Sequence, residues 1–144
     1  SDAEKLYASF NPEKDSGLKG WWANIGAILL ENFKGGSIEK FLTELTDLTY
    51  SYIYKKQKIS REVIEEYIIG VWGKISNENK EKMKTNNPDL YNAVWVLRSL
   101  ENIKDKPENM RQGAFLKVLT YLYIHLPDLF AEARKIVEDT LNVN

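Results

Sequence analysis

Apolar residues recur at every third or fourth position over most of this sequence, and this period constrains the fold more than any other feature. The clearest example runs from Ile38 to about Lys56, and Ser37 precedes it as a good N-cap. Its apolar positions are Ile38, Phe41, Leu42, Leu45, Leu48, Tyr52 and Ile53. A period near 3.6 places these side chains on one face, so the segment is predicted to be an amphipathic helix.

Capping residues, glycines and prolines divide the rest of the chain into further helices. Ser60 is a predicted N-cap, Asn87-Pro88 a predicted helix start, and Pro127 a predicted break. The helix after Ser60 should end near Gly70 and Gly73, with Val63, Ile64, Tyr67, Ile68, Val71 and Trp72 as its apolar stripe. The other expected helices are 3–10, 18–33, 89–102, 108–124 and 128–141, with 77–86 as a short helix or solvated loop.

No strand-like alternation, internal repeat or low-complexity tract competes with this pattern. We therefore predict an all-α fold, a compact bundle of about six or seven helices. Residues 1–144 should form a single helical domain, with residues 1–16 at its periphery. Hydrophobic residues make up 43% of the chain, enough for a packed core.

Charge composition gives no general attraction to nucleic acid or to acidic membranes. Lysine and arginine number 20 against 21 acidic residues, for a net charge of -1. The longest strongly apolar run, 114–126, is interrupted by polar residues and is shorter than the roughly 20 residues that span a bilayer. We expect a soluble cytoplasmic protein with no targeting signal and no membrane insertion.

The residue inventory also excludes the commonest catalytic and metal chemistry. The chain has one histidine, His125, and no cysteine. Cys and Cys/His zinc sites are excluded, and one histidine cannot supply a helical di-iron site. The glycines form no phosphate-binding motif. We predict no catalytic residue, no metal and no cofactor. His125 should be structural, with its ring donating to a carbonyl at the helix C-terminus, and a general base is its alternative role.

Two aromatic features are candidates for binding. The first is the pair Trp21-Trp22, because only one of two adjacent tryptophans is expected on the core face of a helix. The other could lie in a protein interface.

The second candidate is the segment 50–61, in which tyrosines are followed by basic residues. Its candidate binding residues are Tyr50, Tyr54, Lys55, Lys56, Lys58 and Arg61. Aromatic rings can stack on nucleic-acid bases, and neighbouring cations can bind phosphate. The alternative is structural, because lysines at a helix C-terminus also compensate the helix dipole.

These observations predict a non-catalytic module for protein interaction or for assembly of a larger complex, through self-association or a protein partner. Five Phe, four Trp and eight Tyr are many for one small core, which favours an interface. The alternative is a small nucleic-acid-binding subunit of a ribonucleoprotein or viral assembly, using the segment 50–61. Neutralisation of its cations by Glu39, Glu62 or Glu65 would argue against that alternative.

Overall fold

The computed structural model describes residues 20–21 and 38–141, and every regular element in these ranges is helical. In chain order the elements are α3 (Ile38–Gln57), α4 (Arg61–Val63), the π-helix η1 (Ile64–Ile69), the 3-10 helix η2 (Trp72–Lys74), α5 (Asn77–Asn86), α6 (Pro88–Lys104), α7 (Glu108–His125) and α8 (Pro127–Leu141). The predicted all-α bundle is confirmed. The helix predicted over 3–10 and most of the one over 18–33 lie outside the described residues.

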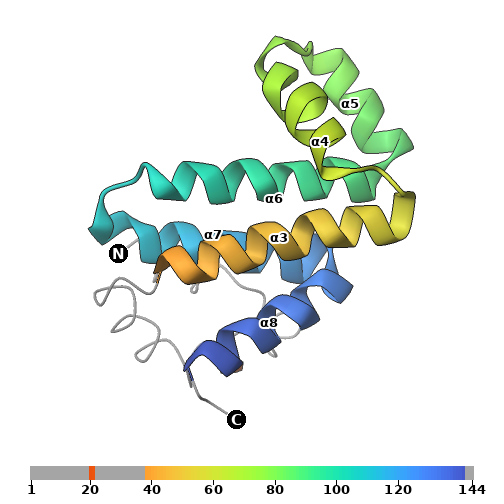
Figure 1. Cartoon of the computed structure of the whole chain (residues 1–144). Helices are drawn as coiled ribbons and strands as arrows, with labels where there is room; N and C mark the ends of the chain where they lie inside the picture. The colour runs from red at the N-terminus through yellow and green to blue at the C-terminus, as the bar shows by residue number, and fades with distance from the viewer. Residues whose placement is uncertain (1–19, 22–37, 142–144) are drawn as a thin grey trace.

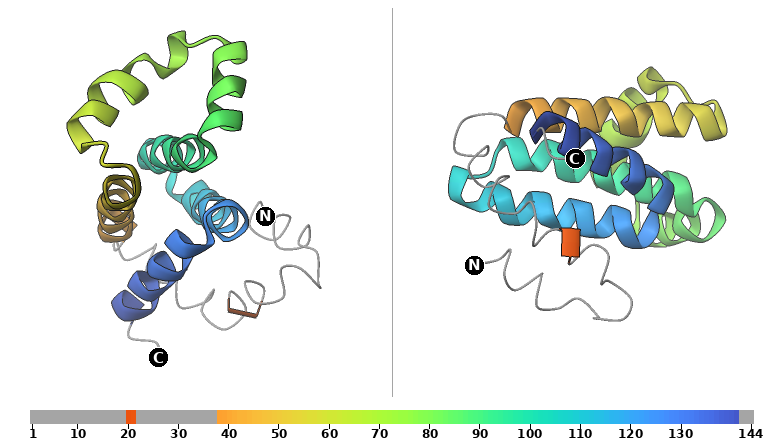
Figure 2. Two further views of the ribbon diagram at one scale, coloured as in Figure 1. Left: turned by 90° about the vertical axis from the view of Figure 1, so that its right-hand side faces the viewer. Right: turned by 90° about the horizontal axis from the view of Figure 1, so that it is seen from below.

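Four long helices form the body of the molecule (Figures 1 and 2). α3 packs on α6 and α8, and α7 packs on the same two helices from the other side, so that the four close a ring around one core. Phe41 of α3 and Phe115 of α7 are both fully buried there, with ring centroids 6.0 Å apart. Their burial contributes to the apolar core that stabilises the bundle.

The sequence pattern accounts for these helices well. The predicted inward face of α6 is buried at every position, namely Leu90, Ala93, Val94, Leu97 and Leu100. Asn87 caps this helix, because its side-chain Oδ1 accepts from the backbone N–H of Leu90 at 3.3 Å. Pro127 separates α7 from α8 as predicted, since it opens α8 at a position where its missing N–H costs no helical hydrogen bond.

Residues 58–86 form a helical excursion that leaves the bundle at the end of α3 and returns to it at the start of α6 (Figures 1 and 2). Lys58 makes the first turn, with a positive φ of 56°. Ser60 then caps α4 by accepting from the Val63 N–H at 3.4 Å. At the base, the side-chain amides of Gln57 and Asn87 exchange two hydrogen bonds of 2.8 Å each, which tie the two ends of the excursion together.

The excursion is where the predicted pattern and the structure differ. One helix was expected after Ser60, but the segment divides into α4, η1 and η2. Its apolar stripe is also only partly buried, because Ile64 and Trp72 lie in the core whereas Val63 and Tyr67 are exposed. The excursion contacts the bundle along one side, so it cannot cover a stripe this wide. The segment 77–86 is a helix, α5, with no buried residue.

Candidate protein-docking surface

The outward face of α4 and η1 carries two large apolar side chains in water. Val63 is 51% exposed and Tyr67 is 71% exposed, and the two lie one helical turn apart. The described residues include three other exposed large hydrophobics, Tyr54, Met110 and Ile124, none of which has such a neighbour at helical spacing. Contiguous exposed apolar groups of this kind mark interaction sites more often than isolated ones.

An acidic row runs beside this apolar row. Glu62 and Glu66 precede Val63 and Tyr67 by one residue each, so the four positions share one side of the helix. Both glutamates are exposed, and neither makes an ion pair or side-chain hydrogen bond with another described residue. We call Glu62, Val63, Glu66 and Tyr67 the acidic-apolar face.

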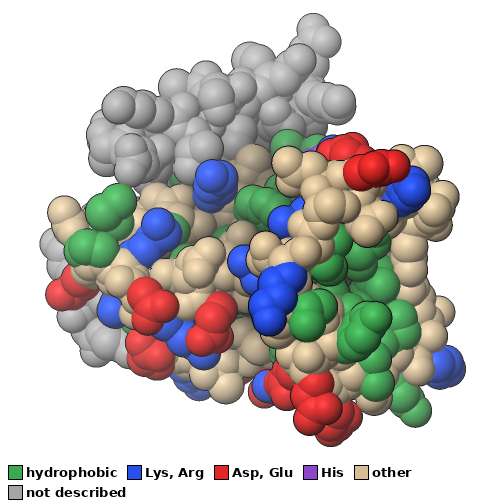
Figure 3. Space-filling view, turned by 90° about the horizontal axis from the view of Figure 1, so that it is seen from above, with side chains coloured by type: hydrophobic (Ala, Val, Ile, Leu, Met, Phe, Trp, Pro, Cys, Tyr) green, Lys and Arg blue, Asp and Glu red, His purple; other side chains and the backbone are tan. Residues whose placement is uncertain are grey.

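The acidic-apolar face is continuous with the buried side of the excursion. The next row around the helix is Ile64, which is fully buried, and the half-buried Ile68. Seen from above, hydrophobic side chains gather over the part of the molecule formed by the excursion, and acidic side chains border them (Figure 3). A partner seated on Val63 and Tyr67 would therefore extend an existing core and meet carboxylates at its outer edge.

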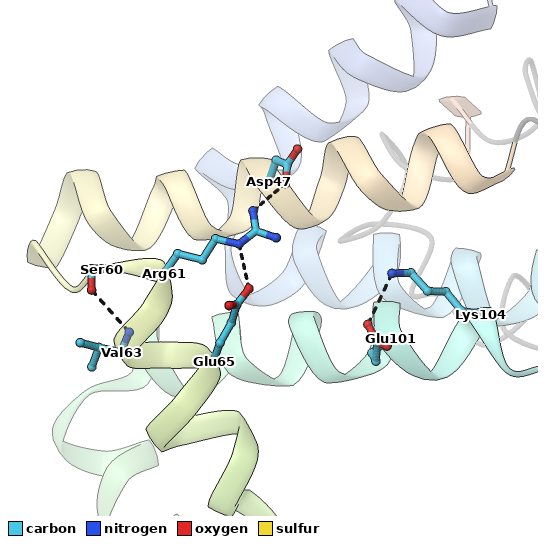
Figure 4. Close-up of polar contacts among 7 residues, drawn as sticks. All are labelled: Asp47, Ser60, Arg61, Val63, Glu65, Glu101 and Lys104. Carbon is cyan, nitrogen blue, oxygen red and sulfur yellow. Dashed lines mark hydrogen bonds and ion pairs between the residues drawn. The ribbon is translucent and has the colours of Figure 1, made fainter.

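Arg61 fixes the orientation of this face relative to the bundle. Its guanidinium contacts Asp47 of α3 at 2.7 Å and Glu65 of η1 at 2.9 Å, and lies 4.4 Å from the centre of the Tyr50 ring. The hydrogen bonds from both carboxylates raise the pKa of Arg61 above its ordinary value. Val63 points to the opposite side of α4 from this cluster (Figure 4), so the anchoring contacts leave the docking side free.

The π-helical form of η1 is a further local feature of the site. The N–H of Gly70 donates to the carbonyl of Glu65, and a Cβ at position 70 would lie 3.3 Å from that oxygen. A side chain at position 70 would therefore make a tight contact with this carbonyl, which glycine avoids. π-Helical turns are rare and are found frequently at functional sites.

The structure does not assemble the segment 50–61 into one exposed basic surface. Tyr50 is 8% exposed beneath Arg61, and burial followed by the nearby Glu65 raises its pKa. Tyr50 is therefore not available as a stacking platform. Arg61 is neutralised by two carboxylates, one of them the Glu65 that the sequence analysis named.

The remaining cations of that segment differ in their surroundings. Lys56 lies 3.8 Å from Asp128 and 5.0 Å from the centre of the Tyr52 ring, whose hydroxyl raises the lysine pKa by hydrogen bonding. Lys58 lies 5.3 Å from the centre of the Tyr54 ring, which is 52% exposed. Lys55 is exposed and makes no ion pair with a described residue. Only Tyr54, Lys55 and Lys58 thus remain available; we call them the basic end of α3.

Of the two tryptophans proposed for an interface, Trp21 is a core residue. It is 5% exposed, its indole N–H donates to Glu138 at 2.8 Å, and its ring meets Phe130 edge-on at 5.9 Å. The guanidinium of Arg134 lies 5.7 Å from the ring centre. These contacts dock residue 21 on α8 and leave it no surface for a partner. Trp22 lies outside the described residues.

His125 belongs to an aromatic stack at the end of α7. Its ring lies 4.3 Å from that of Tyr121, which stacks on Trp95 of α6 at 3.7 Å. The Tyr121 hydroxyl donates to Asn92 at 2.6 Å, and burial raises the pKa of Tyr121 to about 12. Burial, and then the charge of Lys84, lowers the pKa of His125. These contacts are structural packing, and among the described residues they bring no nucleophile or carboxylate to the imidazole.

Sequence reasoning found Val63 and Tyr67 but placed them in the core. The width of the apolar arc is a signal that could have shown that some of these residues are exposed. The arc is wider than one helix contact can bury, and it consists of Val63, Ile64, Tyr67 and Ile68. Their adjacent glutamates are a second signal, since a charged row immediately beside an apolar row is typical of a surface boundary.

Comparison of the chain with protein-family models, with curated proteins and with solved structures finds no match. The fold and the site therefore define the class of protein on their own: an all-α bundle with a projecting helical excursion. Within the described ranges, no group of three or more acidic or histidine side chains could hold a metal ion. None of the described helices is long and apolar enough to cross a membrane.

Proposed function

We propose that this chain is a non-catalytic module for protein interaction or assembly, and that it docks through the acidic-apolar face of α4 and η1. The observation that carries the proposal is the exposure of Val63 and Tyr67, side by side on an excursion that the bundle otherwise holds in place. Fully burying an exposed apolar side chain provides about 1.5–3 kcal/mol. Val63 and Tyr67 would gain the share of this that corresponds to their remaining exposure, before the costs of association.

The anchoring of the excursion supports the same function. Arg61, Ser60 and the Gln57–Asn87 amide pair hold α4 and η1 in one orientation, so that little conformational entropy remains to be lost when a partner binds. A surface fixed in advance binds more tightly than the same side chains on a mobile loop. The excursion therefore has the properties of a presented recognition element.

Affinity capture with a matched pair of variants tests this function. The double substitution Val63→Ser/Tyr67→Ser removes the apolar row, whereas Ile124→Ser removes a side chain of comparable exposure, 51%, from α7. Both variants should fold, because exposed substitutions change stability by only about 0.5 kcal/mol. We expect a stoichiometric partner to be retained by the wild type and by the Ile124 variant and lost at least about tenfold from the double variant. Equal retention by all three would exclude this face.

A further inference from the structure

The basic end of α3 and the acidic-apolar face lie on either side of the same corner of the chain. Residues 58–60 form this corner, so Lys55 lies before it and Lys58 begins it, while Glu62 and Glu66 follow it. Opposite charges are therefore neighbours on the molecule. They do not neutralise one another, because no ion pair joins these lysines to these glutamates in the described part of the chain.

Both surfaces combine charge with an exposed apolar or aromatic group. The acidic-apolar face offers Val63 and Tyr67, and the basic end of α3 offers the Tyr54 ring, 52% exposed, with the Lys58 ammonium 5.3 Å from its centre. The two surfaces thus carry charges of opposite sign. Carboxylates would meet ammonium groups, while the aromatic rings would pack on Val63 and on one another.

Adjacent patches of opposite charge are self-complementary under a two-fold rotation. Turning one copy by half a revolution brings its basic patch opposite the acidic patch of the other, and the reverse contact forms at the same time. The chain carries a net charge of only -1, so long-range repulsion between copies is small.

From this arrangement we propose that a second copy of this chain occupies the acidic-apolar face, in a two-fold dimer in which the basic end of α3 of each copy packs on the face of the other. The inference rests on the proposed function and names its partner. The dimer should weaken with salt, because its charged contacts are at the surface and are screened within about 8–10 Å at physiological ionic strength.

Charge reversal on each patch tests the dimer. Sedimentation equilibrium of the full chain, at about 100 µM protein and about 50 mM salt, should give twice the chain mass for the wild type. The variants Glu62→Lys/Glu66→Lys and Lys55→Glu/Lys58→Glu should each sediment as monomers, because every contact then joins like charges. The control Glu132→Lys/Asp139→Lys reverses two exposed acids of α8 that pair with no described residue, and it should remain dimeric.

An equimolar mixture of the two patch variants gives the decisive result. In that heterodimer both contacts again join opposite charges, so the mass of a dimer should return. Restoration would also show that each variant is folded, because a misfolded chain could not complete the interface. Circular dichroism of each variant alone provides the independent check on folding.

Several results would overturn the inference, and they are distinguishable from failure of the proposed function. A monomeric wild type, a mixture that stays monomeric, or masses above the dimer would each reject the two-fold arrangement. If the wild type is monomeric but capture still depends on Val63 and Tyr67, the face takes another protein and the proposed function stands. A monomeric wild type with salt-steep RNA binding, lost only from the Lys55→Glu/Lys58→Glu variant, would assign these lysines to nucleic acid and reject the dimer.

Discussion

Lys58 leaves α3 in the left-handed region of the backbone map, at a φ of 56°. A side chain with a Cβ is disfavoured there by about 1–2 kcal/mol, which is why glycine is the usual residue after a helix. The backbone N–H of Lys58 still closes the helix by donating to the Tyr54 carbonyl at 2.8 Å. Lysine at this position therefore carries a backbone strain that glycine would not.

Replacing this lysine separates backbone strain from charge. Lys58→Gly should raise the free energy of unfolding by about 0.5–1 kcal/mol, because the relief of the positive φ exceeds the extra entropy of glycine in the unfolded chain. Urea denaturation measures the change. Lys58→Ala is the control: it removes the ammonium but keeps the Cβ, and it should give no gain. If both variants raised the free energy of unfolding equally, the stabilisation would come from removal of the lysine charge and not from relief of backbone strain.

His125 provides a second test at this scale. Partial burial, and then Lys84, lower its pKa below the ordinary 6.5, so the unfolded chain binds the proton before the folded chain as the pH falls. This histidine's contribution is complete above about pH 6.5 and is lost as the pH falls toward the folded-state pKa. NMR titration should find the imidazole pKa below 6.5, and Lys84→Gln should raise it. An unchanged pKa in that variant would contradict the role of Lys84.

At the scale of elements, the excursion depends on the closure at its base. The Gln57–Asn87 amide pair joins the end of α3 to the start of α6, and Asn87 also caps α6. The rest of the excursion contacts the bundle through α4 on α3 and through η1 and α5 on α6. Loss of the pair should therefore loosen residues 58–86 before it affects the four long helices.

Substitutions at Asn87 distinguish its two roles. Asn87→Ala removes both the cap and the amide pair and should lower the free energy of unfolding by about 2 kcal/mol. Asn87→Ser keeps a capping oxygen and should cost about half as much. Hydrogen exchange should show faster exchange across 58–86 in both variants. Equal costs for the two substitutions would mean that capping contributes little.

The elements differ in how far their sequences determine them. α3, α6 and α8 have apolar stripes that match the surface they bury, so periodicity was sufficient to predict them. α7 is apolar on most of its surface, and its prediction depended on the length of this apolar run and on the break at Pro127. The excursion has an apolar arc wider than the single side that contacts the bundle. Local sequence does not specify which row, Ile64 or Val63, meets the core, because that choice depends on Arg61 reaching Asp47, 14 residues away. The docking face could not be predicted for this reason.

At the scale of the whole molecule, one core formed mainly by four helices carries the excursion, which adds Ile64 and Trp72 to that core. Phe115, fully buried against Phe41, belongs to the core, whereas Tyr67 at 71% exposure belongs to the surface. We therefore expect substitutions of the exposed ring to leave the stability of the fold largely unchanged. Most aromatic side chains of the described residues lie in the core or in ring stacks, and Tyr54 and Tyr67 are the exposed ones among them.

This separation predicts opposite effects for two aromatic substitutions. Phe115→Ala should destabilise the fold by about 3–5 kcal/mol through the lost burial and the cavity that remains. Tyr67→Ser should change the free energy of unfolding by no more than about 0.5 kcal/mol and should weaken association. Thermal and urea unfolding measure the first effect, and partner binding measures the second. A large loss of stability in the Tyr67 variant would assign that ring to the fold instead.

The most direct test of the central claim is site-specific photocrosslinking in the cells that make the protein. The photoreactive residue p-benzoylphenylalanine is placed at position 67 in one chain and at position 124, a similarly exposed position on α7, in another. If the acidic-apolar face is a docking surface, irradiation should give a discrete crosslinked product from position 67 and none from position 124. No product at 67, or the same products from both positions, would contradict the assignment of this face as the docking surface.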